Sequence, residues 1–489
     1  MRQRVVLYNP RCVFWTMPLA LVAVGSALDP ARYEVVIVDG RLEPEPLAAL
    51  RRVIDERTVC VGVTVLTGAP IRDALLVTRA VRAAHPRLPV VWGGWHPSLF
   101  PAECLEEEGV TATVSGQGEL TFRELVDRLA EGAPLDGLAG AAHRAAPAAP
   151  RPETSTARRS LLHAGSGVII EAKREMEDLN RLACHNYDLL DVERYFAAKG
   201  RRQLDYISSQ GCRFRCTFCA DPTVFERGWS GLEPRRMGEE LEALWRRYHF
   251  DDLNFQDETY FTHRPRVTAV CEELLRRDLR FTWAATMRAD QGVRLSDADW
   301  ALCKRSGLRR VMVGVESGSQ AMMDWLMKDI KLEQVFETAA LMVRHRIAGI
   351  FPFIVGFPDE TDESVEATLA VIQRLRRMSP AFDVSVYFYQ PYPGSPIADL
   401  IWSRGHRKPS TLDEWADFDY VGSRGSWVTD QKWERVQRFK FYQRHAFGSS
   451  RAAALPLRWL ARARLRTGLL RAPIEKLLVE ALRPERQLS

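Results

Sequence analysis

The sequence contains no long apolar run. Nowhere in its 489 residues do about eighteen consecutive apolar residues occur, which is the length that a membrane-spanning helix needs. Residues 1–8 enter a strand-like pattern at once, without the apolar segment of a secretion signal. We therefore expect a cytoplasmic protein.

Net charge is also low, and the cysteines are few and scattered. The formal charge is only +5, so the composition does not indicate a nucleic-acid partner. Of nine cysteines, six are dispersed without the spacing of a disulfide framework, which suits free thiols in a reducing compartment. These six are Cys12, Cys60, Cys104, Cys184, Cys271 and Cys303. The chain length predicts two or three domains.

The other three cysteines form one motif. Cys212, Cys216 and Cys219 have Cys-x3-Cys-x2-Cys spacing and follow an expected strand over residues 205–209, and Gly211 permits a tight turn before them. Thiolates are the ligands of iron–sulfur clusters. Three thiolates would leave one iron of a four-iron cluster open to a substrate or cofactor, as a catalytic zinc leaves one position open.

A structural zinc site is the alternative for this loop. Zinc usually takes four protein ligands, and the nearest further candidates, Cys184, His185 and His249, are distant in sequence. The loop resembles the signature of the radical S-adenosylmethionine (SAM) enzymes, in which Phe218 fills an aromatic position before the third cysteine. The resemblance implies a [4Fe-4S] cluster, SAM bound to its open iron, and an electron donor of the flavodoxin or ferredoxin type. SAM cleavage would yield a deoxyadenosyl radical that abstracts hydrogen.

The first 135 residues alternate strand and helix patterns. Continuous apolar strands separated by helices predict a doubly wound, Rossmann-like parallel sheet that binds ligands at the carboxyl ends of its strands. The expected strands are residues 5–8, 34–38, 59–65, 89–92 and 111–114, and the expected helices are 17–28, 45–54, 70–85, 101–108 and 118–131.

The loops at these strand ends resemble those of the cobalamin-binding domain. The residues that carry the resemblance, and that it implies contact the cofactor, are Thr64, Gly68, Gly93, Gly94, Ser115, Gly116, Gly118 and Glu119. The family's Asp-x-His-x-x-Gly motif is missing from residues 9–17, which implies cobalamin bound without a histidine ligand. His96 is either a cobalt or phosphate contact or an ordinary loop residue. A flavodoxin-like domain that binds a nucleotide, or nothing, is the alternative for the whole region.

Residues 201–400 contain six further strand-then-helix repeats. They predict a partial (β/α)6 barrel with its functional residues at the carboxyl ends of the strands. The expected strands are residues 205–209, 252–255, 281–284, 311–314, 349–355 and 383–389. We thus predict an α/β protein with a Rossmann-like cobalamin domain (1–135), a linker (136–200), a radical SAM barrel (201–400) and a C-terminal helical extension (401–489).

Further SAM contacts follow from the resemblance. Glu316 would accept hydrogen bonds from the ribose hydroxyls, and Arg288 would pair with the SAM carboxylate. Gly356 and Pro358 end the run that matches the family's adenine-binding strand. Asp257, with the adjacent Glu258, would support the SAM amino group or contact substrate. A carboxylate at a strand end also caps the following helix, which is the structural alternative for each of these acids.

The C-terminal residues 457–466 alternate arginine with apolar residues. Such a helix either lies on an anionic membrane surface or packs on its own protein.

Along nearly its whole length the chain resembles the cobalamin-dependent radical SAM enzymes. The resemblance implies a methyltransferase that moves a methyl group from SAM, through methylcobalamin, to an unactivated carbon of a small molecule after a second SAM has generated the substrate radical. Two alternatives stay open. One is an oxidative cyclase or rearrangement enzyme of the anaerobic magnesium-protoporphyrin monomethyl ester cyclase type, and the other is a cobalamin or iron–sulfur sensor without turnover.

Overall fold

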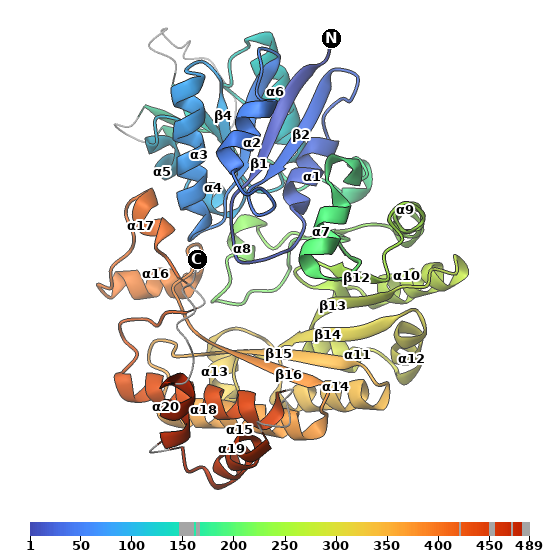
Figure 1. Cartoon of the computed structure of the whole chain (residues 1–489), viewed down its shortest axis with the longest axis vertical. Helices are drawn as coiled ribbons and strands as arrows, with labels where there is room; N and C mark the ends of the chain where they lie inside the picture. The colour runs from blue at the N-terminus through green and yellow to red at the C-terminus, as the bar shows by residue number, and fades with distance from the viewer. Residues whose placement is uncertain (146–160, 163–166, 420–421, 449–454, 471–472, 482–489) are drawn as a thin grey trace. The chain divides into compact units, whose positions relative to one another are not determined.

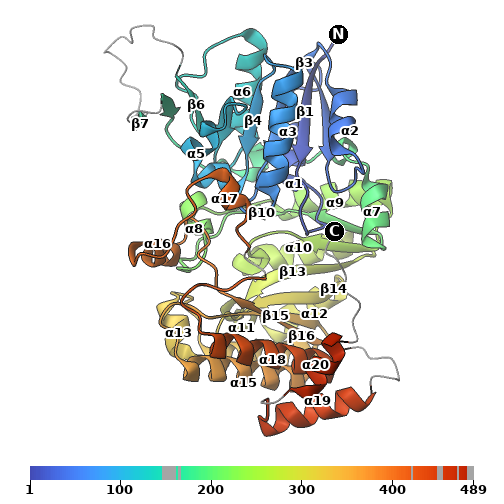
Figure 2. The same cartoon turned by 60° about the vertical axis from the view of Figure 1, so that its left-hand side comes forward.

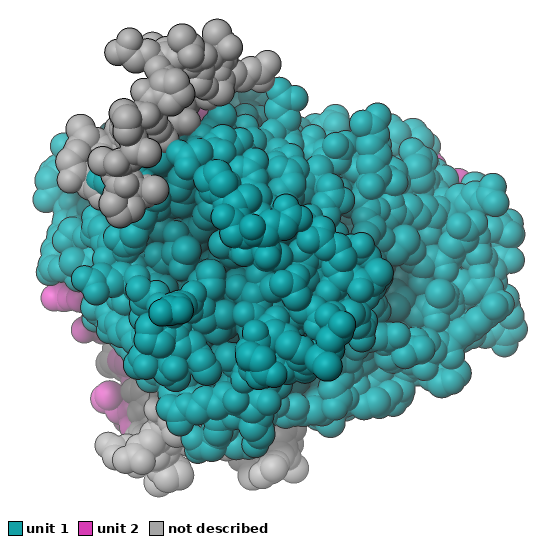
Figure 3. Space-filling view, turned by 90° about the horizontal axis from the view of Figure 1, so that it is seen from above, with its two compact units in different colours: residues 1–286, 301–309, 392–419 teal, residues 287–300, 310–391, 420–489 magenta. Residues whose placement is uncertain are grey.

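The computed structural model consists of two compact units, coloured separately in Figure 3. Unit 1 comprises residues 1–286, 301–309 and 392–419, and unit 2 comprises residues 287–300, 310–391 and 420–489. The structure describes residues 1–145, 161–162, 167–419, 422–448, 455–470 and 473–481.

The N-terminal part of unit 1 is built on a parallel sheet. Its five parallel strands have the order β2-β1-β3-β4-β5, which confirms the predicted doubly wound fold. They are β1 (Gln3–Asn9), β2 (Tyr33–Asp39), β3 (Thr58–Thr64), β4 (Val90–Gly93) and β5 (Ala112–Val114).

Helices cover both faces of this sheet (Figure 1). They are α1 (Leu19–Ser26), α2 (Pro46–Val53), α3 (Pro70–Ala84), α4 (Trp95–Leu99), α5 (Pro101–Glu106) and α6 (Glu119–Glu131). Alternate residues of β1 enter different cores, since successive side chains of a strand point to opposite faces. Val5 and Leu7 pack with α1 and α6, whereas Val6 and Tyr8 pack with α2 and α3.

Three short strands extend the sheet into the segment that the sequence predicts to be a linker (Figure 2). β6 (Ala141–Arg144) pairs antiparallel with β5 and with β8 (Val168–Ile170), and β7 (Leu161–Leu162) pairs with β8. The sequence Ala-Ala-His-Arg of β6 has little strand propensity, and the others are too short to show an alternating pattern. Helix α7 (Val192–Lys199) follows, and the domain boundaries given above stay a prediction.

Six strands carry the second set of repeats, in the predicted order. They are β9 (Gln203–Tyr206), β12 (Asp252–Phe255), β13 (Thr282–Arg288), β14 (Leu308–Gly314), β15 (Ala348–Val355) and β16 (Phe382–Phe388). In unit 1, β12 pairs in parallel with β9 and β13. In unit 2, β15 pairs in parallel with β14 and β16.

Helices follow these strands as the sequence predicts, with three short additional ones, α8, α11 and α13. The set is α8 (Asp221–Val224), α9 (Pro234–Tyr248), α10 (Arg264–Arg276), α11 (Ala289–Arg294), α12 (Asp297–Arg305), α13 (Gln320–Trp325), α14 (Leu332–Arg344) and α15 (Asp362–Met378).

The C-terminal region is helical where it is described. Unit 1 contains α16 (Pro396–Ser403) and α17 (Leu412–Ala416), and unit 2 contains α18 (Asp430–Phe447), α19 (Leu455–Thr467) and α20 (Ile474–Ala481). Trp415 of α17 stacks on Phe100 at a centroid distance of 5.1 Å, and its Nε1 donates to Glu103. Within the described ranges, no helix combines the length and the apolar character needed to cross a bilayer.

Candidate active site

The cysteine loop lies in unit 1 and is closed at its base by a two-residue strand pair. β10 (Ser209–Gln210) pairs antiparallel with β11 (Ser230–Gly231) on the far side of the loop. The parallel strand β9 already ends at Tyr206, earlier than predicted. The carbonyl of Ser208 accepts hydrogen bonds from the Leu232 amide and from Arg266 Nη2, which turns the chain away from the sheet.

Asp257 holds the segment that enters the loop. Its carboxylate accepts from the Ser208 amide at 2.7 Å and from the hydroxyls of Ser208 and Ser209 at 2.6 Å each. Burial raises the pKa of Asp257. These bonds occupy the carboxylate, so Asp257 positions the cysteine loop. This role differs from both predicted ones, the helix cap and the contact with SAM or substrate, and the latter contact stays a prediction.

The three thiols lie close enough to influence one another. Burial raises the pKa of Cys212 to about 11 and that of Cys219 well above its usual value, and in both cases the neighbouring thiols and Asp221 contribute further. The three sulfurs are not all within 4.8 Å of one another. A single zinc ion with Zn–S bonds of about 2.3 Å would require that closeness, so the donor set fits a larger iron–sulfur cluster better.

Gly211 fixes the shape of the loop, and its replacement by alanine gives a direct test. Gly211 has φ +79°, and an added Cβ would lie 2.3 Å from the carbonyl oxygen of Gly228. We expect Gly211→Ala to lower the free energy of unfolding by roughly 2–4 kcal/mol and to reduce the iron bound per chain. Gly200→Ala is the matched control, because Gly200 has φ +64° but no atom within 4 Å of the added Cβ. Equal iron content in both variants, measured after anaerobic reconstitution, would contradict this account.

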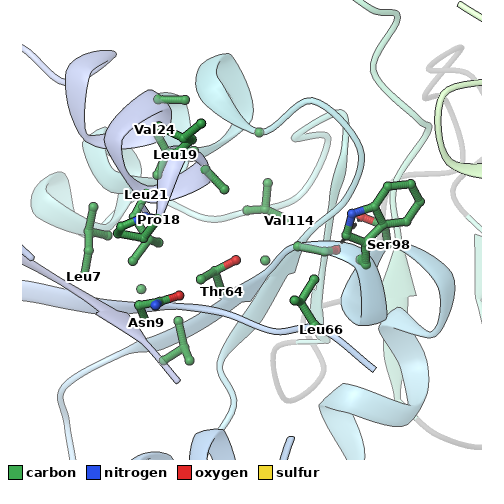
Figure 4. A pocket seen from close by; sticks show the side chains of 18 of the residues that line it. Leu7, Asn9, Pro18, Leu19, Leu21, Val24, Thr64, Leu66, Ser98 and Val114 are labelled. Atoms are coloured by element: carbon green, nitrogen blue, oxygen red, sulfur yellow. Dashed lines mark hydrogen bonds between the residues drawn. The ribbon is translucent and has the colours of Figure 1, made fainter. Parts of the chain in front are cut away.

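A cavity of about 550 Å³ lies within unit 1 at the strand ends of the first sheet. Figure 4 shows its largely apolar wall, with Asn9 and Thr64 among Leu7, Leu66 and Val114. The structure brings six of the eight predicted cobalamin-contact residues into the lining: Thr64, Gly93, Gly94, Gly116, Gly118 and Glu119. Gly68 and Ser115 lie outside it, and the Ser115 hydroxyl donates instead to the Pro97 carbonyl.

The glycines of the cavity allow a ligand to approach the backbone closely. Gly94 has φ +99°, and a Cβ there would lie 3.0 Å from Thr64 Oγ1 and from the backbone of Val65. A Cβ at Gly93 would meet only atoms of Val114, at 3.7 Å or more, so the space in front of it is open. Close backbone approach and apolar walls suit the nucleotide tail of cobalamin.

The same cavity also receives residues from the side of the cysteine loop. Gln210, Phe225 and Glu258 line it, in addition to the strand-end glycines. Burial raises the pKa of Glu258 well above its usual value, and its Oε2 has no hydrogen-bond partner among the described residues. The strand-end loops and residues that flank the cysteine motif therefore border one space inside unit 1, although none of the three cysteines lines it.

Two glutamines that the sequence reasoning missed connect these loops. Gln117 Nε2 donates to Gln210 Oε1 at 2.9 Å, and Gln210 Nε2 donates to Glu119 Oε1 at 3.1 Å. Burial raises the pKa of Glu119. Only their positions in the sequence could have indicated these glutamines, because Gln117 lies between the predicted glycines and Gln210 lies two residues before Cys212.

His96 neither lines the cavity nor lies in an exposed loop. Its ring is fully buried, packs against Trp415 and places Nδ1 3.1 Å from Thr67 Oγ1. Burial lowers the pKa of His96 to about 3. The suggested cobalt or phosphate contact is not supported, and His96 belongs to the core between α4 and α17.

The other predicted SAM residues lie in unit 2. Glu316 has φ +68°, is buried, and accepts a hydrogen bond from Lys328 Nζ at 2.7 Å. The sequence did not indicate Lys328, which holds the Glu316 carboxylate in one orientation. The structure places Arg288 Nε 2.9 Å from Asp290 Oδ1 and its Nη2 against the Lys328 carbonyl. Pairing with the SAM carboxylate stays a prediction that requires Arg288 to exchange these partners.

Gly356 and Pro358 form a buried turn after β15. Gly356 has φ +74°, its amide donates to Glu360, and its carbonyl accepts from Trp427 Nε1 at 2.8 Å. Phe357, between them, stacks on Tyr389 at a centroid distance of 4.7 Å. The adenine contact assigned to this turn stays a prediction.

Comparison with known proteins agrees with both parts of the site. The family model described as the radical SAM superfamily matches residues 206–372, and that of the B12 binding domain matches residues 13–126. The chain belongs to the cobalamin-binding radical SAM enzymes. Its cofactors are accordingly a [4Fe-4S] cluster, SAM and cobalamin, for which the cysteine loop and the glycine-lined cavity supply suitable residues.

Individual relatives have low sequence identity to this chain but match it over most of its length. An uncharacterized methyltransferase of Pyrococcus horikoshii is 27% identical over 81% of this chain and 82% of its own length. The anaerobic magnesium-protoporphyrin IX monomethyl ester cyclase of Rubrivivax gelatinosus is 26% identical over 71% of this chain and 58% of its own length. The structure of the radical S-adenosylmethionine methyltransferase TsrM from Kitasatospora setae superposes with a TM-score of 0.66, at 19% identity, over 83% of this chain and 78% of TsrM. That similarity supports the fold.

Proposed function

We propose that this enzyme transfers a methyl group from SAM, by way of cobalamin, to an unactivated carbon atom of a small-molecule substrate. The observation that carries the proposal is the cavity in unit 1, which is lined both by the strand-end glycines of the cobalamin domain and by Gln210 and Glu258 beside the cysteine loop. When bound, cobalamin and cluster-bound SAM supply methyl transfer and radical hydrogen abstraction.

In this proposal the protein acts mainly by positioning. The three cysteines hold the cluster, Asp257 fixes the strand that leads to them, and Gln210 fixes the distance to the cobalamin loop. The apolar wall of the cavity excludes water, which protects a reactive radical from side reactions. Orientation of reacting groups in one enclosed space provides a large part of the rate enhancement of such enzymes.

The test is comparative mass spectrometry of anaerobic cultures with and without the gene, grown on methionine labelled in its methyl group. A gene-dependent compound that carries one additional labelled methyl group supports methyl transfer and identifies the substrate. The cyclase similarity favours oxidative cyclisation as a second function, and a gene-dependent product that has lost hydrogen or gained oxygen, without label, would replace the first proposal by the second. Cells that express Cys216→Ala serve as the control.

The same proposal includes an electron donor of the flavodoxin or ferredoxin type, because reductive cleavage of SAM consumes one electron. It also places the enzyme in a reducing cytoplasm, in which the cysteines stay thiols. We expect the purified enzyme to release deoxyadenosine only when such a reduced donor, or dithionite, is present.

We also propose that α19 contacts an anionic membrane surface. Ala461 and Leu465 of this helix are buried, whereas Trp459 is 70% exposed and Arg462 and Arg466 are also exposed. At about 1 kcal/mol for each arginine, Arg462→Ser with Arg466→Ser should weaken binding to phosphatidylserine vesicles about thirtyfold. The exposed Arg51→Ser/Arg52→Ser pair on α2 is the control in a co-sedimentation assay. Equal loss in both double variants, or no binding by the unmodified protein, would exclude a specific α19 contact.

A further inference from the structure

A second group of metal-ligating side chains lies in the extension of the first sheet. Asp136 belongs to the turn after α6, His143 lies on β6, and Glu171 directly follows β8. One ligand atom from each of the three lies within 4.8 Å of the others. Antiparallel pairing of β6 with β8, in which His143 is opposite Ile169, brings His143 and Glu171 together from distant parts of the sequence.

The hydrogen bonding of His143 leaves one ring nitrogen, Nε2, facing carboxylate oxygens. Its Nδ1 lies 3.1 Å from the carbonyl oxygen of Arg144, an atom that only accepts, so Nδ1 carries the proton. In the neutral ring, Nε2 then presents a lone pair. Nε2 is buried and has no hydrogen-bond partner among the described residues, although Glu171 Oε1 lies 3.5 Å away. A lone pair that faces two carboxylates is repelled unless a cation lies between them.

The distance between His143 Nε2 and Glu171 Oε1, and the hydrogen bonds that hold these two side chains, match a metal site. Two ligands at about 2.1 Å from a tetrahedral ion are about 3.4 Å apart, close to the separation of His143 Nε2 and Glu171 Oε1. A histidine that binds metal through one nitrogen typically donates its other N–H to a backbone carbonyl, as His143 does here. The Gly137 amide donates to Glu171 Oε1 at 2.8 Å and fixes that carboxylate as well.

We propose that Asp136, His143 and Glu171 bind a divalent transition-metal ion that ties the turn after α6 to strands β6 and β8. One imidazole and two carboxylates suit zinc or a similar first-row ion better than calcium or magnesium. Two carboxylates and a neutral imidazole carry the charge that a divalent cation balances. Asp136 is exposed, so solvent can complete the coordination. The site uses none of the residues of the cluster or of the cobalamin cavity.

The experiment measures zinc on the full-length enzyme after its cluster has been reconstituted, with iron counted in the same sample. We expect about one zinc per chain, an upward shift of the melting temperature on adding zinc, and its reversal by a chelator. Asp136→Asn and His143→Gln should weaken zinc binding at least tenfold without changing the iron content. Asp136→Asn replaces an exposed side chain, so it tests the ligand role without disturbing the core.

Asp413→Asn, which removes an exposed aspartate from α17, is the matched control and should bind zinc as the unmodified enzyme does. Zinc binding that survives in Asp136→Asn and His143→Gln would overturn the proposal. The absence of any zinc beyond that bound by the cysteine loop would overturn it as well.

Discussion

Replacing Cys216 by alanine is expected to remove the iron–sulfur cluster and, with it, all cleavage of SAM. Cys216 is buried, at 8% exposure, whereas Cys212 and Cys219 are of intermediate exposure, and the loop has no fourth cysteine that could replace it. With two thiolates left, the cluster loses a ligand that only a soft donor provides. Deoxyadenosine formation should fall on the order of 1000-fold or more, a loss of about 4 kcal/mol in transition-state stabilisation. Iron analysis and a dithionite-driven assay measure both effects.

The control for this variant is Cys184→Ser. Cys184 is an exposed free cysteine outside the loop, so its loss should leave iron and turnover unchanged. If Cys216→Ala keeps its iron and its deoxyadenosine formation, the assignment of the loop as the cluster site is wrong.

Replacing Gly93 by leucine is expected to abolish cobalamin binding while the cluster remains. The added side chain would occupy the open space in front of Gly93, within the cavity that receives the cofactor in our proposal. Because a cofactor cannot share this volume with an isobutyl group, its dissociation constant should rise at least about 100-fold, which corresponds to about 2.7 kcal/mol. Cobalt and iron counted in the same reconstituted sample separate the two cofactors.

Gly93→Ala provides the graded control. A single Cβ at Gly93 comes no closer than 3.7 Å to any neighbour, so the alanine variant should fold normally and retain most of its cobalamin. Loss of iron together with cobalt in Gly93→Leu would mean that the substitution unfolds the domain. Full cobalt binding by Gly93→Leu would place the cofactor elsewhere.

The fold was predictable where single elements carry strong patterns. The apolar strands β1 to β5 and the amphipathic helices α2, α3 and α6 show their period in the sequence, and the structure contains them within a few residues of the expected ends. Strand β6 was not predictable, because its pairing with β5 and β8 comes from tertiary contacts and not from strand-forming residues. The early end of β9 likewise depends on Arg266, which is about sixty residues away in sequence.

The loops that form the site were predictable, but the side chains that pair with each predicted residue were not. Cysteine spacing and glycine pairs are local features, so the cysteine motif and six residues of the cavity lining could be named in advance. Lys328 beside Glu316, and Asp290 beside Arg288, depend on side-chain packing that no spacing reveals. For the same reason the sequence left His96 as either a cofactor contact or an ordinary loop residue, although Trp415 of α17, more than three hundred residues later, packs against its buried ring.

The glutamine pair has a consequence for recombination between related enzymes. Gln210 bonds both Gln117 and Glu119, so a chimera joined within residues 136–200 would combine the cobalamin loop of one parent with the cluster entrance of another. If the parents differ at position 117, 119 or 210, the chimera would combine side chains that do not form these hydrogen bonds with one another. A crossover placed after the cysteine loop, so that residues 117, 119 and 210 descend from the same parent, keeps both cofactor sites in register and is the better junction for exchanging substrate-binding regions.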